Sequence, residues 1–112
     1  SPNQKIYTKV KNEEPTYYAN TSKVSTSQFA SGSIIEGEVV QSVLSRNIYV
    51  HKDSVVKDSI LFPRVVIGQG AQIEYAILDK GVEVADGVVI RGTAEHPVVI
   101  KKGEKVTEDI QS

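Results

Sequence analysis

The chain has 112 residues, 13 basic and 14 acidic side chains and a formal net charge of −1 at pH 7, so it carries no charge excess that would favour nucleic acid or acidic substrates. It contains no cysteine, which excludes disulfides, thiolate catalysis and cysteine-based metal sites and is compatible with the cytoplasm, where we expect the protein to be located. No apolar run approaches the ~20 residues needed to span a bilayer, so we expect no membrane association.

Residues 1–21 are rich in Lys, Glu, Asn and Thr and lack the repeat that follows them. Alternation over residues 6–10 is typical of a short edge strand, Pro15 interrupts it, and Tyr17 and Tyr18 offer an aromatic anchor. The segment is either a linker into the first repeat or a piece that packs between this domain and another one. Because the sequence begins with Ser and contains no Met, we expect it to be part of a longer protein.

A repeat begins after this segment, and the leucines reveal it. The chain has three leucines, Leu44, Leu61 and Leu78, and the two intervals between them are equal. Steps of five, six and six along the chain meet an aliphatic residue every time. These residues are Val39, Leu44, Val50, Val56, Leu61, Ile67, Ile73, Leu78, Val84 and Ile90. The residues two positions earlier are all small or β-branched, namely Gly37, Ser42, Ile48, Ser54, Ser59, Val65, Ala71, Ala76, Val82 and Val88.

The period predicts a fold with three sides. Extended segments of about six residues must turn a corner to recur in register, and three corners close a triangle. One large and one small side chain per segment then point inward from the same pleat. Successive turns stack at ~4.8 Å, and each short strand pairs in parallel with its neighbours. The sequence therefore predicts a single-domain, all-β parallel β-helix of the hexapeptide type, a triangular prism.

The pattern extends upstream through Val24, Phe29 and Ile35, after which a step of four leads to Val39. A coil shortened by two residues at one corner explains that step. We assign residues 22–92, about four turns, to the β-helix. An α-helical alternative fails because Val, Ile, Ser and Thr dominate and glycines recur throughout.

Residues 93–112 complete the chain. The run Val98-Val99-Ile100 predicts a strand that covers the open end of the stack, because an uncovered edge invites aggregation. The charged residues that follow predict a solvated tail; they are Lys101, Lys102, Lys105, Glu108 and Asp109.

Few residues suggest chemistry. His51 follows the inward Val50 at a corner, and His96 precedes Pro97 in a terminal loop. Neither has a partner set for general-base catalysis, and two isolated histidines make no recognised metal-ligand spacing. We therefore interpret both as surface residues. The sequence assigns no catalytic, cofactor-binding or metal residue.

The run Gly68-Gln69-Gly70 invites comparison with a phosphate loop. A true phosphate loop needs a following helix and, in the Walker form, Gly-Lys-Ser/Thr, and neither is present, so corner glycines are the better interpretation. Six acidic residues fall between the inward positions and predict a solvated face; they are Glu36, Glu38, Asp53, Asp58, Glu74 and Asp79.

The amino-acid sequences of three segments are more specific than their periodicity alone. Residues 31–50 (SGSIIEGEVVQSVLSRNIYV), 65–84 (VVIGQGAQIEYAILDKGVEV) and 92–103 (GTAEHPVVIKKG) resemble the C-terminal domain of glucose-1-phosphate adenylyltransferases, the ADP-glucose pyrophosphorylases of bacterial glycogen synthesis. The shortened corner at residues 35–39 belongs to this resemblance, which covers nearly the whole chain. Right-handed crossovers are the rule for parallel strands, and the resemblance implies the left-handed exception.

The resemblance implies a missing N-terminal nucleotidyltransferase domain that binds ATP, with Mg, and glucose 1-phosphate. It implies that this C-terminal domain packs on that domain, contributes to a homo- or heterotetramer with a catalytic subunit, takes part in allosteric regulation and is itself catalytically silent. Effector-binding residues do not carry over, although Lys9, Lys11 and Lys23 are cationic.

One departure distinguishes two kinds of subunit. Catalytic members of the family carry Pro-Pro-Ala-Lys where this chain has Glu14-Pro15-Thr16-Tyr17, so Tyr17 replaces the lysine. This departure and the ending at residues 92–103 favour the non-catalytic partner subunit. A hexapeptide acyltransferase, which needs an intersubunit histidine, and a structural trimerisation module remain open alternatives.

Overall fold

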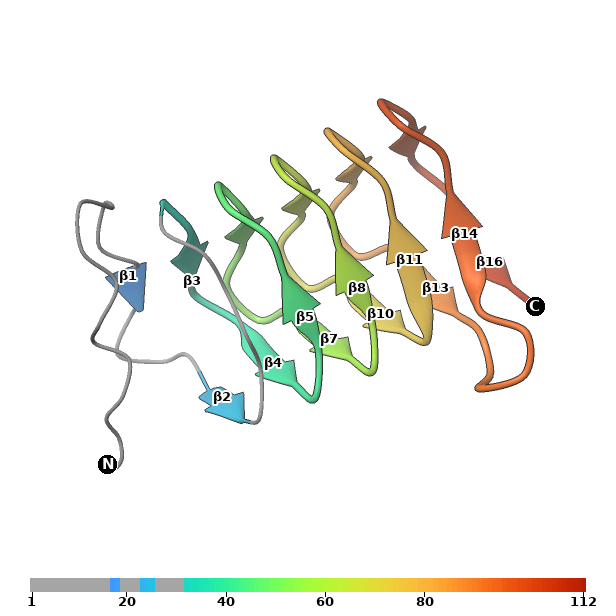
Figure 1. Ribbon diagram of the computed structural model, residues 1–112, viewed down its shortest axis with the longest axis horizontal. Helices are drawn as coiled ribbons and strands as arrows, with labels where there is room; N and C mark the ends of the chain where they lie inside the picture. Colours follow the sequence, from blue (N-terminus) through green and yellow to red (C-terminus); the bar gives the residue numbers. More distant parts are fainter. Residues whose placement is uncertain (1–16, 19–22, 26–31) are drawn as a thin grey trace.

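The structure is a computed structural model that describes residues 17–18, 23–25 and 32–112. Those residues form an all-β, left-handed parallel β-helix of about five turns, and they contain no helix (Figure 1). The predicted fold class is confirmed. Three sheets, here called A, B and C, form the sides of the prism, and the strand pairings within them are parallel.

From Ile34 to Gln111 the chain contributes short strands to sheets A, B and C in turn. Sheet A consists of β1 (Tyr17–Tyr18), β3 (Ile34–Ile35), β6 (Tyr49–Val50), β9 (Val66–Ile67), β12 (Glu83–Val84) and β15 (Lys105–Val106). Sheet B consists of β2 (Lys23–Ser25), β4 (Glu38–Val40), β7 (Val55–Lys57), β10 (Gln72–Glu74), β13 (Val89–Arg91) and β16 (Ile110–Gln111). Sheet C consists of β5 (Val43–Leu44), β8 (Ile60–Leu61), β11 (Ala76–Leu78) and β14 (Val98–Ile100).

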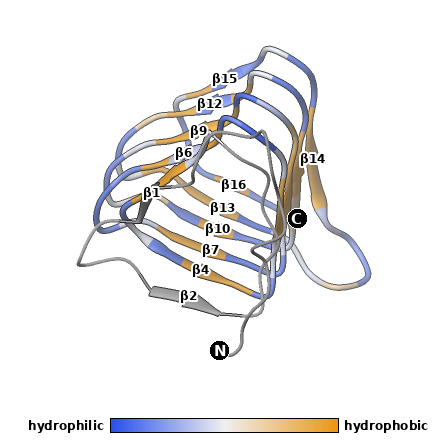
Figure 2. Cartoon of the chain, turned by 60° about the vertical axis from the view of Figure 1, so that its left-hand side comes forward, coloured by the Kyte–Doolittle hydropathy of each residue, from blue (hydrophilic) through white to orange (hydrophobic). Residues whose placement is uncertain are grey.

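The interior of the prism contains the residues that the period selected. All ten aliphatic residues from Val39 to Ile90 are buried, and so are all ten small or β-branched residues two positions before them. Hydrophobic residues recur on the strands of all three sheets, and β14 is hydrophobic along its length (Figure 2). The leucine column shows how the layers stack, because Leu44 pairs with Leu61 in register, and Leu61 with Leu78.

The shortened corner lies where the sequence places it. Val24 pairs with Val39 and Ile35 with Val50, whereas Val39 pairs with the more distant Val56. The wider offset of the last pair shows that the corner between β3 and β4 is shorter by two residues than its counterparts. Phe29, which continued the pattern upstream, lies outside the described residues.

Left-handed backbone turns form the corners, and they recur with the same period. One column contains Gln41, Asp58 and Tyr75, a second contains Asn47, Arg64 and Gly81, and a third contains Asp53, Gly70 and Gly87; all have φ between 47° and 73°. Within each column the spacing equals that of the leucines. The six non-glycine members show that the stack imposes this conformation on residues that disfavour it by about 1–2 kcal/mol.

Buried serines connect coils at the corner between sheets B and C. The Ser59 hydroxyl donates to the carbonyl of Lys57 at 2.7 Å and accepts from the Ala76 N–H at 3.1 Å. Ser42 makes the same two contacts one coil earlier, with the Val40 carbonyl and the Ser59 N–H. Each serine therefore provides a buried amide of the next coil with an acceptor.

We expect Ser59→Ala to lower the free energy of unfolding by about 1–2 kcal/mol, because the Ala76 N–H would be left buried without its acceptor. Urea denaturation followed by circular dichroism would measure the change. Ser45→Ala is the matched control, since Ser45 is only half-buried and its substitution should change stability by less than about 0.5 kcal/mol. Equal stabilities of the two variants would contradict the role given to Ser59.

At both ends, the bounds of the β-helix differ from the range 22–92 expected from the sequence. β1 pairs with β3 and is the terminal strand of sheet A, so the coil begins before residue 22. At the other end, the expected strand exists as β14, but it pairs beside β11 as a further rung of sheet C. The expected solvated tail contains β15 and β16, which extend sheets A and B. Residues 93–97 form an added loop before β14. The loop increases the separation along the sequence between paired residues of β11 and β14.

Candidate functional site

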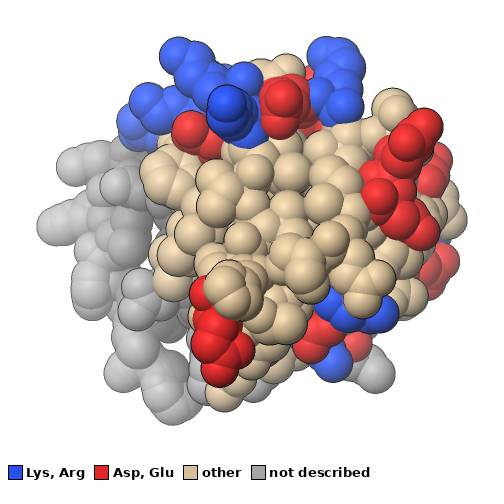
Figure 3. Space-filling view, turned by 90° about the vertical axis from the view of Figure 1, so that its right-hand side faces the viewer, with Lys and Arg blue, Asp and Glu red and all other residues tan. Residues whose placement is uncertain are grey.

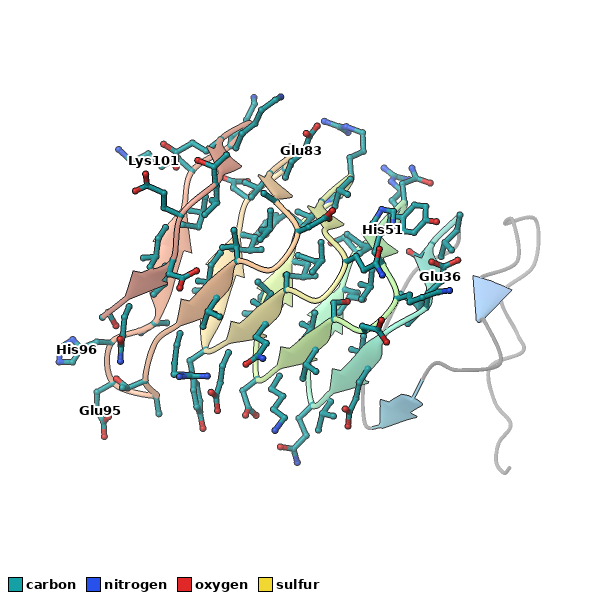
Figure 4. The ribbon with its side chains drawn as sticks, turned by 180° about the vertical axis from the view of Figure 1, so that it is seen from behind. Glu36, His51, Glu83, Glu95, His96 and Lys101 are labelled. Atoms are coloured by element: carbon teal, nitrogen blue, oxygen red, sulfur yellow. The ribbon has the colours of Figure 1, made fainter. Side chains whose placement is uncertain are left out.

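His51 lies half-buried at the corner between sheets A and B. Its ring stacks on the ring of Tyr49, with centroids 3.8 Å apart and an interplanar angle of 11°. The Tyr49 hydroxyl donates to Glu36 Oε1 at 3.4 Å, so the three side chains form one cluster toward the N-terminal end of the prism (Figure 4). In the described part of the chain, no carboxylate accepts a hydrogen bond from the His51 ring, so nothing there orients it as a general base.

His96 lies on the exposed loop of residues 93–97, far from His51 (Figure 4). Its contacts are made by the main chain: its N–H donates to Thr93 Oγ1 at 3.0 Å, and its carbonyl accepts from the hydroxyl of Ser112. The fold does not bring the two histidines together. Among the residues that the structure describes, no group of three or more His, Cys, Asp or Glu side chains could hold a metal ion.

The Gly68-Gln69-Gly70 run forms a corner of the helix. Gly70 has a φ of 73°, and Gly68 packs against the main chain of the next coil at Asp86. The Gln69 N–H donates to Asp86 Oδ1 at 2.8 Å. In a phosphate loop such an amide would donate a hydrogen bond to the ligand. Here the Asp86 carboxylate of the protein itself accepts that hydrogen bond.

The six acidic residues expected on a solvated face are exposed or half-buried. Glu74 Oε1 lies 3.3 Å from Arg91 Nε on sheet B, and both side chains are more than one third exposed, so the pair contributes at most about 1 kcal/mol. The departures at residues 14–16 and the cations Lys9 and Lys11 lie outside the described residues. The side chains of Tyr17 and Lys23 are likewise not described.

Among the described residues, the outer face of sheet C carries an unbroken column of aliphatic side chains. Val43, Ile60, Ile77 and Val99 point outward and pair with one another in register, one from each strand. We call them the sheet C ladder. Val43, Ile60 and Val99 are 47%, 41% and 62% exposed, which is unusual for large aliphatic side chains. Sequence reasoning missed this ladder, although an aliphatic residue precedes each of the three leucines.

The other two faces carry charge. The outward column of sheet A ends in Glu83 and Lys105, whose side chains lie 3.7 Å apart. An outward column of sheet B contains Lys57, Glu74 and Arg91 in register. Sheet C is therefore the described face whose central outward column contains no charged residue on any rung.

The corners segregate charge by sign. The corner between sheets C and A, here called the basic corner, carries five basic residues, Arg46, Arg64, Lys80, Lys101 and Lys102, and two acidic ones, Asp79 and Glu104. The corner between sheets A and B, the acidic corner, carries one basic residue, Lys52, and five acidic ones, Glu36, Asp53, Asp86, Glu108 and Asp109. Seen along the prism from its C-terminal end, basic side chains gather at the top and acidic ones at the right (Figure 3).

Comparison with known proteins agrees with this geometry. The family model described as "GlmU-like, C-terminal hexapeptide" matches residues 9–109. No curated protein matches the chain. A solved mutant of perosamine N-acetyltransferase from Caulobacter crescentus, in complex with CoA and GDP-perosamine, is similar with a TM-score of 0.75 and 16% identity over 86% of this chain. A second mutant structure of that GDP-perosamine N-acetyltransferase is similar with a TM-score of 0.58 and 18% identity over 87% of this chain.

At these identities the two likenesses show the fold alone. The chain spans about half the length of these acetyltransferases, since the matches cover 47% of each. In the described residues, no helix is both long and apolar enough to cross a membrane.

Proposed function

The chain belongs to the GlmU-like, C-terminal hexapeptide family, and from this premise we propose that it is the C-terminal domain of a glucose-1-phosphate adenylyltransferase of glycogen synthesis. We assign it to the non-catalytic subunit of that cytoplasmic enzyme. In this role the β-helix serves assembly and regulation of a tetramer, and the chemistry on ATP, Mg and glucose 1-phosphate belongs to a nucleotidyltransferase domain upstream.

The observation that carries the proposal is the outer surface of the prism. The described residues offer an apolar face and two corners of opposite charge. Such a surface suits association of subunits better than turnover of a small substrate. The ADP-glucose assignment rests on the three segments quoted from the sequence and on the shortened corner between β3 and β4.

A hexapeptide acyltransferase is the second candidate, because His51 lies at a coil corner with Tyr49 and Glu36 beside it. In that case a neighbouring subunit would have to complete the site and a CoA ester would have to bind beside the ring. Isothermal titration with CoA discriminates the two functions. Heat of binding that disappears in His51→Ala would favour the acyltransferase, and no binding would favour the assembly domain.

We expect the intact parent protein to release no pyrophosphate from ATP and glucose 1-phosphate when assayed alone. Mixed with its catalytic partner, it should change the partner's KM or its response to effectors, because the two share an assembly. An unrelated β-helix protein at equal concentration is the control. Robust activity of the parent alone would make it the catalytic subunit, and unchanged partner kinetics would contradict the proposed role.

A further inference from the structure

We propose that two copies of this chain associate through sheet C, face to face, with their β-helix axes parallel and related by a twofold axis that runs along the sheet C ladder. The inference deepens the assembly role proposed above and rests on it.

The ladder supplies the driving force. Each of its four rungs presents one aliphatic side chain, and Phe62, half-buried beside the ladder, extends the apolar surface. Transfer of apolar surface from water into a contact is favourable in proportion to the area buried. The outer faces of sheets A and B would have to desolvate ion pairs in the same kind of contact, namely Glu83 with Lys105 and Glu74 with Arg91.

A second copy fits this surface because the geometry repeats. Stacked rungs lie ~4.8 Å apart, and two sheets pack face to face at ~10 Å. Because a second copy has the same spacing between rungs, each of its aliphatic side chains can lie opposite or between those of the first copy along the whole ladder. The strands of sheet C pair in register on every rung, which keeps the four aliphatic side chains in one column.

The charges decide the direction. Sheet C lies between the corner that contains Asp58 and the basic corner that contains Arg64, and these two residues flank the same strand, β8. If the axes were antiparallel, the basic corners of the two copies would face each other, with Arg46 and Arg64 against Lys102 and Lys80. If the axes are parallel, Asp58 faces Arg64 of the second copy, twice. Neither residue forms an ion pair within the described part of the chain, and like charges across an interface disfavour the wrong arrangement.

The test uses thiol cross-linking, to which the cysteine-free chain is suited. In the parallel dimer each ladder residue meets its own copy across the twofold axis. The Val43→Cys chain should therefore be linked to itself by the short cross-linker bismaleimidoethane, as each thiol adds to one maleimide. A direct disulfide suits this less well, because facing sheets at ~10 Å exceed the ~7 Å limit between Cα atoms. Gln72→Cys, exposed on sheet B, is the matched control.

We expect at least about tenfold more linked dimer from Val43→Cys than from Gln72→Cys at equal concentration, because association raises the effective concentration of the facing thiols. Val99→Cys should behave like Val43→Cys. Linkage only in a mixture of the Val43→Cys and Val99→Cys chains would show an antiparallel pair and overturn the direction. Equal linkage of Val43→Cys and Gln72→Cys would overturn the face.

Sedimentation of the unmodified chain completes the test, with a concentration-dependent dimer expected; a trimer, or a monomer at every concentration, would overturn the proposal. These outcomes are separate from the pyrophosphate assay. If cross-linking fails while the parent still alters its partner's kinetics, only the face is wrong. If cross-linking succeeds and the kinetics stay unchanged, the dimer stands and the glycogen role fails.

Discussion

Leu61→Asp is expected to abolish the folded state. Leu61 has no exposed surface, and Leu44 and Leu78 lie in register on the coils on either side of it. Burying a leucine contributes about 1.5–3 kcal/mol, and an isolated carboxylate in the same dry space costs considerably more. Because a domain of this size is stable by only about 5–15 kcal/mol, one such substitution removes most or all of it. Circular dichroism and the dispersion of amide proton resonances would show the loss of structure.

Ile60→Asp is the matched control. It places the same charge on the same strand, β8, one residue earlier, at a side chain that is 41% exposed on the outer face. This variant should fold, with a stability within about 1 kcal/mol of the parent chain. It should also lower the self-association through sheet C. A soluble, folded Leu61→Asp chain would refute the inward orientation of the leucine column.

The contrast between these neighbours explains why the core was predictable. In an extended strand side chains alternate between the two faces, so the regular spacing of the leucines assigns inward and outward positions without knowledge of the three-dimensional structure. The narrow prism tolerates only aliphatic and small residues, and the sequence obeys that restriction on every coil from Val39 to Ile90. The shortened corner was predictable for the same reason, as it changes the period at one place.

The C-terminal end was predicted less well because the added loop interrupts the period. Residues 93–97 lie between Ile90 and Ile100, and a search in steps of five or six stops there. Beyond the loop the pattern resumes, since a step of six leads from Ile100 to Val106 and both are buried. A local loop therefore hid a further coil that has the same packing as the others.

The candidate interface was harder to predict than the core. Val43 and Val99 lie far apart in the sequence, and only the stacking of rungs places them on one face. The charge of the corners has the same origin, because Arg46, Arg64 and Lys80 lie at the same corner on successive coils. The positive φ at Arg64 and Tyr75 also follows from the stack, since the local sequence does not favour it.

Two glycines of one corner are expected to differ sharply when each is replaced by alanine. A methyl group at Gly68 would lie 2.6 Å from the main-chain nitrogen of Asp86 and 2.7 Å from the carbonyl carbon of Ala85. These are main-chain atoms of the next coil and cannot turn aside, so we expect Gly68→Ala to cost about 3 kcal/mol, the upper end of the range for overpacking. Urea denaturation at equilibrium would measure this loss.

Gly70→Ala is the comparison, and its penalty has a different cause. Nothing lies within 4 Å of a methyl group at Gly70, but its φ of 73° disfavours any side chain by about 1 kcal/mol. Gly68 is thus required by the distance between coils, and Gly70 by the direction of the turn. Since each coil rests on the one before it, crowding at Gly68 should weaken the stack on both sides, whereas strain at Gly70 stays local. Equal losses in the two variants would contradict this division, because they would show that the coils can separate to admit the methyl group.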